Sequence, residues 1–200
     1  MAKGRKATSN ENPARHTVVI SDVESMYWKL SWDIQQFDEI QRNYPEVVEP
    51  LAYAAINVCI SAVSLRDWTV ATFVAKSRAN GKKVKESIVV DHIHKHVLQQ
   101  AMCEAIANTA KHARFHEGKW EGGSVRIDFE ESDEDDSGGL VLRHIHEDGA
   151  FTSIALNAFM SMDSNWWAEL QNLGFAFPRT PPEWRQRQLQ KIFGAFTGPD

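Results

Sequence analysis

Hydrophobic side chains recur every three or four residues along most of this chain, which is the spacing of a helix with one buried face. The first such stretch ends near Asn43, just before Pro45, a residue that cannot continue a helix. Its start is marked by Ser21 and Glu24, whose spacing is that of a capping box. The inward positions are Val23, Tyr27, Leu30, Ile34 and Phe37. The pattern predicts an amphipathic helix over residues 21–43.

A second apolar stretch, residues 50–79, is hydrophobic on more than one side, which is typical of a helix at the centre of a bundle. Pro50 suits the first turn of a helix, and Asn80 with Gly81 suits its C-terminal end. No uninterrupted apolar run approaches the roughly 20 residues that a membrane-spanning helix needs. We therefore predict a central core helix and no membrane partner.

A third helix is predicted over residues 90–114. Its inward positions are Val97, Leu98, Ala101, Met102, Ala105 and Ile106. The segment just before it, residues 87–96, carries three histidines. The pattern leaves open whether this segment joins the helix or forms a separate short turn.

The period then changes from helical to alternating. Residues 124–130 alternate apolar and polar side chains, as a strand does, and residues 139–146 follow after an acidic stretch. Asp148 and Gly149 favour a tight turn before a third short strand. Helical spacing returns from Leu156 onward. We predict a mainly α (α+β) fold, a helical bundle with a small three-stranded antiparallel β-sheet inserted at about 124–155, before the last helices.

Composition and charge narrow the class of protein. Two hundred residues with 42% hydrophobic side chains suffice for one domain, predicted at 17–200 behind a disordered basic tail at 1–16. The net charge of −5 argues against a protein that coats nucleic acid through bulk charge. Cys59 and Cys103 both lie in apolar helical patterns, which indicates buried thiols in a reducing compartment. We expect a cytoplasmic location and no cofactor.

Two groups of polar residues are candidates for one shared site. Asn108, Lys111 and His112 cluster on the third predicted helix, and Arg66 and Asp67 interrupt the central one. In a catalytic interpretation His112 is a general acid or base oriented by Asp67, while Lys111 and Arg66 bind an anion. In a structural interpretation the cations suit a helix C-terminus, and Arg66 and Asp67 pair with residues of the third helix.

The histidine-rich segment offers a second candidate site. On a helix, His92 and His96 share a face and suit a metal ion, with Asp91 or His112 completing the ligand set. If the segment is extended, His92, His94 and His96 share a face instead. Solvated surface histidines are the alternative, because the type of ligand alone constrains a metal site only loosely.

One stretch of the chain resembles a group of uncharacterised bacterial proteins. Its recurring features are a helix ending Ala-Asn-x-x-Lys-His and an Asp-Trp pair on the long apolar helix before it. The matching residues here are Asp67, Trp68, Ala107, Asn108, Lys111 and His112. The resemblance covers about residues 50–173 in element order. That group is distantly similar to the HEPN superfamily, whose helical bundles often act in RNA cleavage and in anti-phage or toxin–antitoxin systems.

The resemblance implies a fold more than a reaction. Catalytic HEPN proteins carry an arginine followed by four to six residues and a histidine, and no arginine here has a histidine at that distance. We therefore expect a non-catalytic or regulatory module of a bacterial defence or toxin-type system, forming a homodimer or binding a protein partner. The alternatives are an RNA-directed nuclease whose altered site contains Arg66, Asp67, Asn108, Lys111 and His112, and a histidine-rich metal protein.

Overall fold

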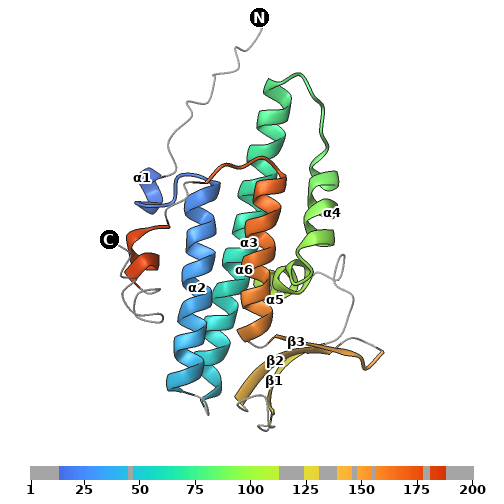
Figure 1. Ribbon diagram of the computed structural model, residues 1–200. Helices are drawn as coiled ribbons and strands as arrows, with labels where there is room; N and C mark the ends of the chain where they lie inside the picture. Colours follow the sequence, from blue (N-terminus) through green and yellow to red (C-terminus); the bar gives the residue numbers. More distant parts are fainter. Residues whose placement is uncertain are drawn as a thin grey trace, which may run out of the picture.

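The computed structural model describes residues 14–44, 47–112, 124–130, 139–145, 148–154, 156–177 and 181–187. Helices α2 (Val23–Asn43), α3 (Val48–Ala79) and α6 (Leu156–Asn172) stand side by side (Figure 1). Helix α5 (Gln100–His112) crosses them, and α4 (Glu86–His96) lies beside α3. A short α1 (Ala14–Thr17) precedes α2. The predicted mainly helical bundle is confirmed.

The start of α2 is fixed by a capping box one residue away from the predicted one. The Ser25 backbone N–H donates to Asp22 Oδ1 over 2.8 Å, and the Asp22 N–H donates to Ser25 Oγ over 3.0 Å. The predicted box of Ser21 with Glu24 is therefore wrong. A carboxylate at this position also meets the positive end of the helix dipole, which favours Asp22 over its serine neighbour.

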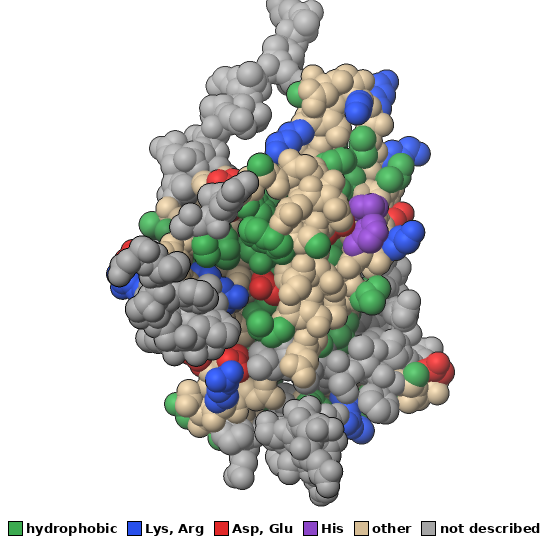
Figure 2. Space-filling model, viewed as in Figure 1, with side chains coloured by type: hydrophobic (Ala, Val, Ile, Leu, Met, Phe, Trp, Pro, Cys, Tyr) green, Lys and Arg blue, Asp and Glu red, His purple; other side chains and the backbone are tan. Residues whose placement is uncertain are grey.

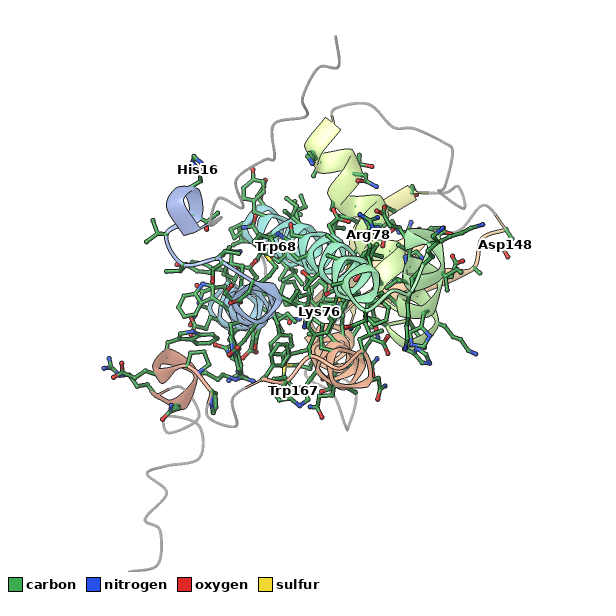
Figure 3. All side chains as sticks on the ribbon, turned by 90° about the horizontal axis from the view of Figure 1, so that it is seen from above. His16, Trp68, Lys76, Arg78, Asp148 and Trp167 are labelled. Atoms are coloured by element: carbon green, nitrogen blue, oxygen red, sulfur yellow. The ribbon has the colours of Figure 1, made fainter. Side chains whose placement is uncertain are left out.

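Helix α3 is the centre of the core, as predicted. It packs against α2, α4 and α5, and seen along the bundle the side chains of α2, α3 and α6 fill the space between the helices (Figure 3). Its buried hydrophobic side chains are Leu51, Ala54, Ala55, Val58, Cys59, Ala62, Leu65, Val70 and Val74. The many small side chains let neighbouring helices approach closely without leaving cavities.

Polar residues interrupt the apolar run of α3, but its mean hydropathy over a window of 18 residues is that of a possible membrane span. Within the described residues this helix is long and apolar enough to cross a membrane, judged by length and composition. The core helix of a globular protein and a membrane span look alike by that test. Here the apolar side chains of α3 pack against α2 and α5.

The third predicted helix is broken into α4 and α5. Residues 97–99 form a turn, with the Gln100 backbone N–H donating to the Val97 carbonyl over 3.0 Å. Val97 is buried, as predicted, but Leu98 was expected to face inward and is 74% exposed. The turn rotates the chain, so a helical spacing counted across it assigns the wrong face. Helix α4 itself buries two side chains, Val89 and Ile93.

Between α5 and α6 the chain forms an antiparallel sheet of β1 (Ser124–Glu130), β2 (Gly139–Ile145) and β3 (Phe151–Ile154), in that order. Its register pairs Ile127 with Leu142 and Arg143 with Ser153. Strand β2 contacts α3, and β3 contacts α6. The acidic segment 131–136 lies outside the described residues.

The C-terminal helical turn, residues 183–187, is held against α2 by aromatic rings. The Trp184 ring lies edge-on to Trp32, with centroids 5.2 Å apart, and to Trp28, with centroids 6.4 Å apart. Such edge-to-face pairs add stabilisation to the burial of the rings. They explain part of the high tryptophan content of this chain.

Replacing Phe37 by alanine should lower the free energy of unfolding by about 3–5 kcal/mol. Phe37 is fully buried and its ring lies edge-on to Phe159, with centroids 4.9 Å apart, so truncation leaves a cavity between α2 and α6. Tyr53→Ala is the matched control, because Tyr53 is exposed and should change stability by no more than about 0.5 kcal/mol. Urea unfolding measures both; equal losses would contradict the described core.

Candidate metal centre

The two histidines predicted as metal ligands lie on one face of α4. His92 and His96 are four residues apart on this helix, and their ring centroids are 4.2 Å apart. The helical conformation excludes the extended alternative in which His94 shares their face. Their side chains are 45% and 40% exposed. Histidine side chains gather at the surface over α4, next to α6 (Figure 2).

A buried carboxylate of α6 completes this group. Glu169 is 1% exposed, and its Oε1 lies 3.1 Å from His92 Nε2 while its Oε2 lies 3.3 Å from His96 Nδ1. The predicted completing ligands do not take this place: Asp91 is exposed, and the side chain of His112 lies outside the described residues. The sequence does contain a signal for Glu169, because it shares the apolar stripe of Trp166 and Leu170 on α6.

The three side chains have the geometry of a ligand set. Their ligand atoms all lie within 4.8 Å of one another. Around an ion with bonds of roughly 2.0–2.2 Å, tetrahedral ligand atoms lie about 3.3 Å apart, and each Glu169 oxygen lies at about that distance from one of the two imidazole nitrogens. Neither Glu169 oxygen makes a hydrogen bond of acceptable geometry. The imidazole nitrogens therefore approach the carboxylate without aligning an N–H toward it, and the residues fit a shared cation.

Burial makes the ionised form of the Glu169 side chain energetically unfavourable. A carboxylate removed from water is destabilising unless a counter-charge or several hydrogen bonds replace its hydration. In the described part of the chain the groups facing its oxygens are the two imidazoles. Either imidazolium rings or a metal ion held by neutral rings can supply the missing positive charge.

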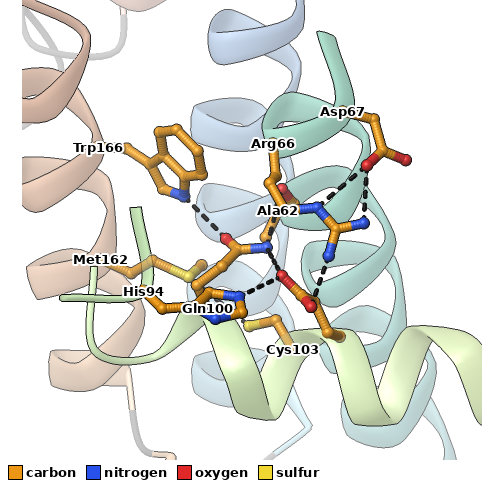
Figure 4. Close-up of polar contacts among 9 residues, drawn as sticks. Ala62, Arg66, Asp67, His94, Gln100, Cys103, Met162 and Trp166 are labelled. Atoms are coloured by element: carbon orange, nitrogen blue, oxygen red, sulfur yellow. Dashed lines mark hydrogen bonds and ion pairs between the residues drawn. The ribbon is translucent and has the colours of Figure 1, made fainter. Parts of the chain in front are cut away.

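A separate polar network joins residues of α3, α4, α5 and α6 (Figure 4). Arg66 of α3 donates to Asp67 Oδ1 over 2.7 and 3.0 Å, and its Nη1 lies 2.5 Å from Glu104 Oε2 on α5. Glu104 Oε1 lies 2.8 Å from His94 Nε2. The predicted pairing of Arg66 with the third helix is confirmed, and its partner is Glu104, a residue that the sequence analysis did not single out.

Gln100 connects this network to α6. Its side-chain amide donates to Glu104 Oε1 over 3.1 Å and to the Ala62 carbonyl over 3.4 Å. Its carbonyl oxygen accepts from Trp166 Nε1 over 3.2 Å. Both Gln100 and Trp166 are fully buried. A polar group this deep is stabilising only when it is hydrogen-bonded, and here both ends of the amide are.

The network shifts the acidity of its members. Burial alone would raise the pKa of Glu104, but the hydrogen bond to His94, the charge of Arg66 and the hydrogen bond from Gln100 together lower it below its usual 4.5. For Arg66 burial alone would lower the pKa, yet the contacts with Asp67 and Glu104 raise it above its usual range. Both ionised forms are therefore favoured in the folded state.

The predicted catalytic group does not converge in the described contacts. Arg66 and Asp67 meet each other, whereas Asn108 and Lys111 are exposed on α5. Among the described side chains, no hydrogen bond or ion pair joins Asn108 or Lys111 to the Arg66–Asp67 pair. The side chain of His112 lies outside the described residues, so its predicted role as an acid or base stays a prediction.

The two cysteines are buried and free, as predicted. A hydrogen bond with Cys103 and burial raise the pKa of the Cys59 thiol well above its usual range. Cys103 Sγ lies 3.6 Å from Met162 Sδ. A thiol whose pKa is raised is a poor nucleophile and a poor metal ligand, which applies to Cys59. Both cysteines lie in the hydrophobic core.

Comparison with protein families, curated proteins and solved structures finds no match to this chain. The metal centre and the polar network therefore rest on their own geometry.

Exchanging Glu104 for glutamine should remove an acid-sensitive part of the stability. Because the folded-state pKa of Glu104 is lowered, its contribution is present above the unfolded pKa and is lost as pH falls through the folded pKa. The difference in unfolding free energy between the native chain and Glu104→Gln should thus be largest near neutral pH and shrink below about pH 4.5. Urea unfolding at a series of pH values measures it, with the exposed Glu183→Gln as control. A difference independent of pH would contradict the ionised network.

Proposed function

We propose that this protein binds a divalent transition-metal ion, of which Zn²⁺ is the best fit, through His92, His96 and Glu169. The observation that carries the proposal is the approach of two imidazole nitrogens to a carboxylate that is 1% exposed and lacks aligned hydrogen bonds. Two imidazoles and one carboxylate are a known ligand set for zinc and for non-haem iron. This develops the metal-protein alternative from the sequence, with Glu169 as the missing ligand.

The proposed ligands come from two helices, the histidines from α4 and the carboxylate from α6. Glu169 supplies the negative charge from the interior, where low polarity strengthens its attraction for a cation. His92 would bind through Nε2 and His96 through Nδ1, which are the atoms nearest the carboxylate. Three protein ligands would leave a bound Zn²⁺ able to hold a water molecule, because both histidines are partly exposed to solvent. Zinc bound in this manner lowers the pKa of a coordinated water and acts as a Lewis acid.

Metal binding should be measurable with Co²⁺ as a spectroscopic substitute for Zn²⁺. The native chain should bind one equivalent with visible absorption bands, and Zn²⁺ should displace it. His92→Ala and His96→Ala should each weaken binding by more than about 100-fold, beyond the loss expected from an outer contact. His16→Ala is the control, because His16 is an exposed histidine on α1 and should leave the affinity unchanged. Equal binding by all variants would contradict the site.

Glu169→Gln separates a metal site from a simple ion pair. Without metal this variant removes a buried charge but keeps the size of the side chain. With Zn²⁺ at 100 times its dissociation constant, the native chain should gain about 2.7 kcal/mol in unfolding free energy. Glu169→Gln should lose most of that gain, whereas Glu183→Gln, at an exposed position, should retain it. A native chain that gains nothing from Zn²⁺ would reduce the cluster to imidazole–carboxylate pairs.

The roles implied by the HEPN resemblance stay predictions. They include a homodimeric or partner-binding regulatory module, action on RNA and a cytoplasmic location. None of the described contacts favours them over the metal site. A metal-binding helical protein is compatible with each of them, since an ion at α4 and α6 leaves the surface of α2 untouched.

A further inference from the structure

Gln100 of α5 is hydrogen-bonded to α6, which carries Glu169, and through Glu104 of its own helix it is connected to α4, which carries the two histidines. On one side its Oε1 accepts from Trp166 Nε1 over 3.2 Å, and Trp166 lies one turn before Glu169 on α6. On the other side its Nε2 donates over 3.1 Å to Glu104 Oε1, which also lies 2.8 Å from His94 Nε2. His94 lies between His92 and His96 on α4. Among the described side chains, Gln100 and Glu104 together therefore connect α6 to α4: Gln100 is hydrogen-bonded to Trp166, and Glu104 contacts His94.

The hydrogen bonds determine which way the Gln100 amide points. Its oxygen must face the indole N–H of Trp166, a donor without acceptor capacity, and its nitrogen must face Glu104 and the Ala62 carbonyl, which only accept. A flipped amide would oppose donor to donor at one end and acceptor to acceptor at the other. Since Gln100 is fully buried, water cannot relieve such a mismatch. The amide thus holds its neighbours in one arrangement.

Glu104 is itself held in place by a charge. Arg66 Nη1 lies 2.5 Å from Glu104 Oε2, and Arg66 is also bonded to Asp67 on its own helix. The carboxylate therefore offers its second oxygen to His94 and Gln100 together (Figure 4). Glu104 therefore connects α4 to the central helix α3, because it contacts both His94 and Arg66. Gln100 connects α6 to the same carboxylate, because it is hydrogen-bonded to both Trp166 and Glu104.

We infer that Gln100 is a positioning residue for the His92–His96–Glu169 site, setting the separation between the imidazole-bearing helix and the carboxylate-bearing helix. The inference rests on the proposed metal-binding function. Metal–ligand distances tolerate deviations of only about 0.2 Å, so a small displacement of α4 against α6 weakens an ion held between them. Mutation of a residue that hydrogen-bonds to a metal ligand commonly changes metal affinity by about 10–100-fold. Gln100 touches no ligand, so its effect has to act through the positions of α4 and α6.

The test compares Gln100→Met with Cys103→Ala in the full chain, using Co²⁺ as the probe. Methionine keeps the length of the side chain and removes both hydrogen bonds. Cys103 is also on α5 and fully buried, but it takes no part in the network, so it reports the effect of core damage alone. We expect Gln100→Met to bind Co²⁺ about tenfold more weakly with altered visible bands, and Cys103→Ala to retain the native affinity and spectrum.

Trp166→Phe supplies a second, milder variant in case Gln100→Met does not fold. It keeps an aromatic ring in the core and removes the N–H that Gln100 accepts. It should also weaken Co²⁺ binding, and the double variant should bind no more weakly than Gln100→Met, because both changes break the same connection. Additive losses, or native affinity and spectrum in Trp166→Phe or Gln100→Met, would overturn the positioning role while leaving metal binding intact. A native chain that binds no Co²⁺ or Zn²⁺ would overturn both.

Discussion

The cost of placing carboxylates inside an apolar helical bundle governs the polar contacts of this structure. Glu104 and Glu169 both point inward, and each needs positive charge or hydrogen bonds to replace the water it has lost. Glu104 finds them in Arg66, Gln100 and His94. Glu169 finds two imidazoles whose hydrogens are not aligned with it. The contrast between a satisfied and an unsatisfied carboxylate is what distinguishes a structural network from a binding site.

Much of the helical core could be predicted from spacing alone. The apolar positions of α2 and the all-round hydrophobicity of α3 follow from a period of 3.6, and the structure buries those side chains. The pairing of Arg66 with the third helix also followed, because a charge on a core helix requires a partner. The turn at 97–99 was missed, since no glycine or proline marks it and Val97 and Leu98 resemble continuing helix.

The third proposed ligand, Glu169, shows which contacts cannot be predicted from a single sequence. His92 and His96 share a face by local geometry, which any helix of this spacing provides. Glu169 follows more than 70 residues later in the sequence, and only the packing of α4 beside α6 brings it near. An acidic residue within an apolar stripe signals that some partner exists. It does not identify which helix supplies that partner, because this depends on the arrangement of the bundle.

Helix α4 buries few aliphatic side chains, which lowers the free energy needed to detach it from the bundle. Its buried residues are Val89 and Ile93, and its side-chain contacts with α5 and α6 include the imidazole–carboxylate pairs of His92, His94 and His96. Local opening of such a segment costs less than global unfolding. Detachment of α4 would carry two of the three proposed metal ligands away together, so release of a bound ion would be coupled to local opening of this helix.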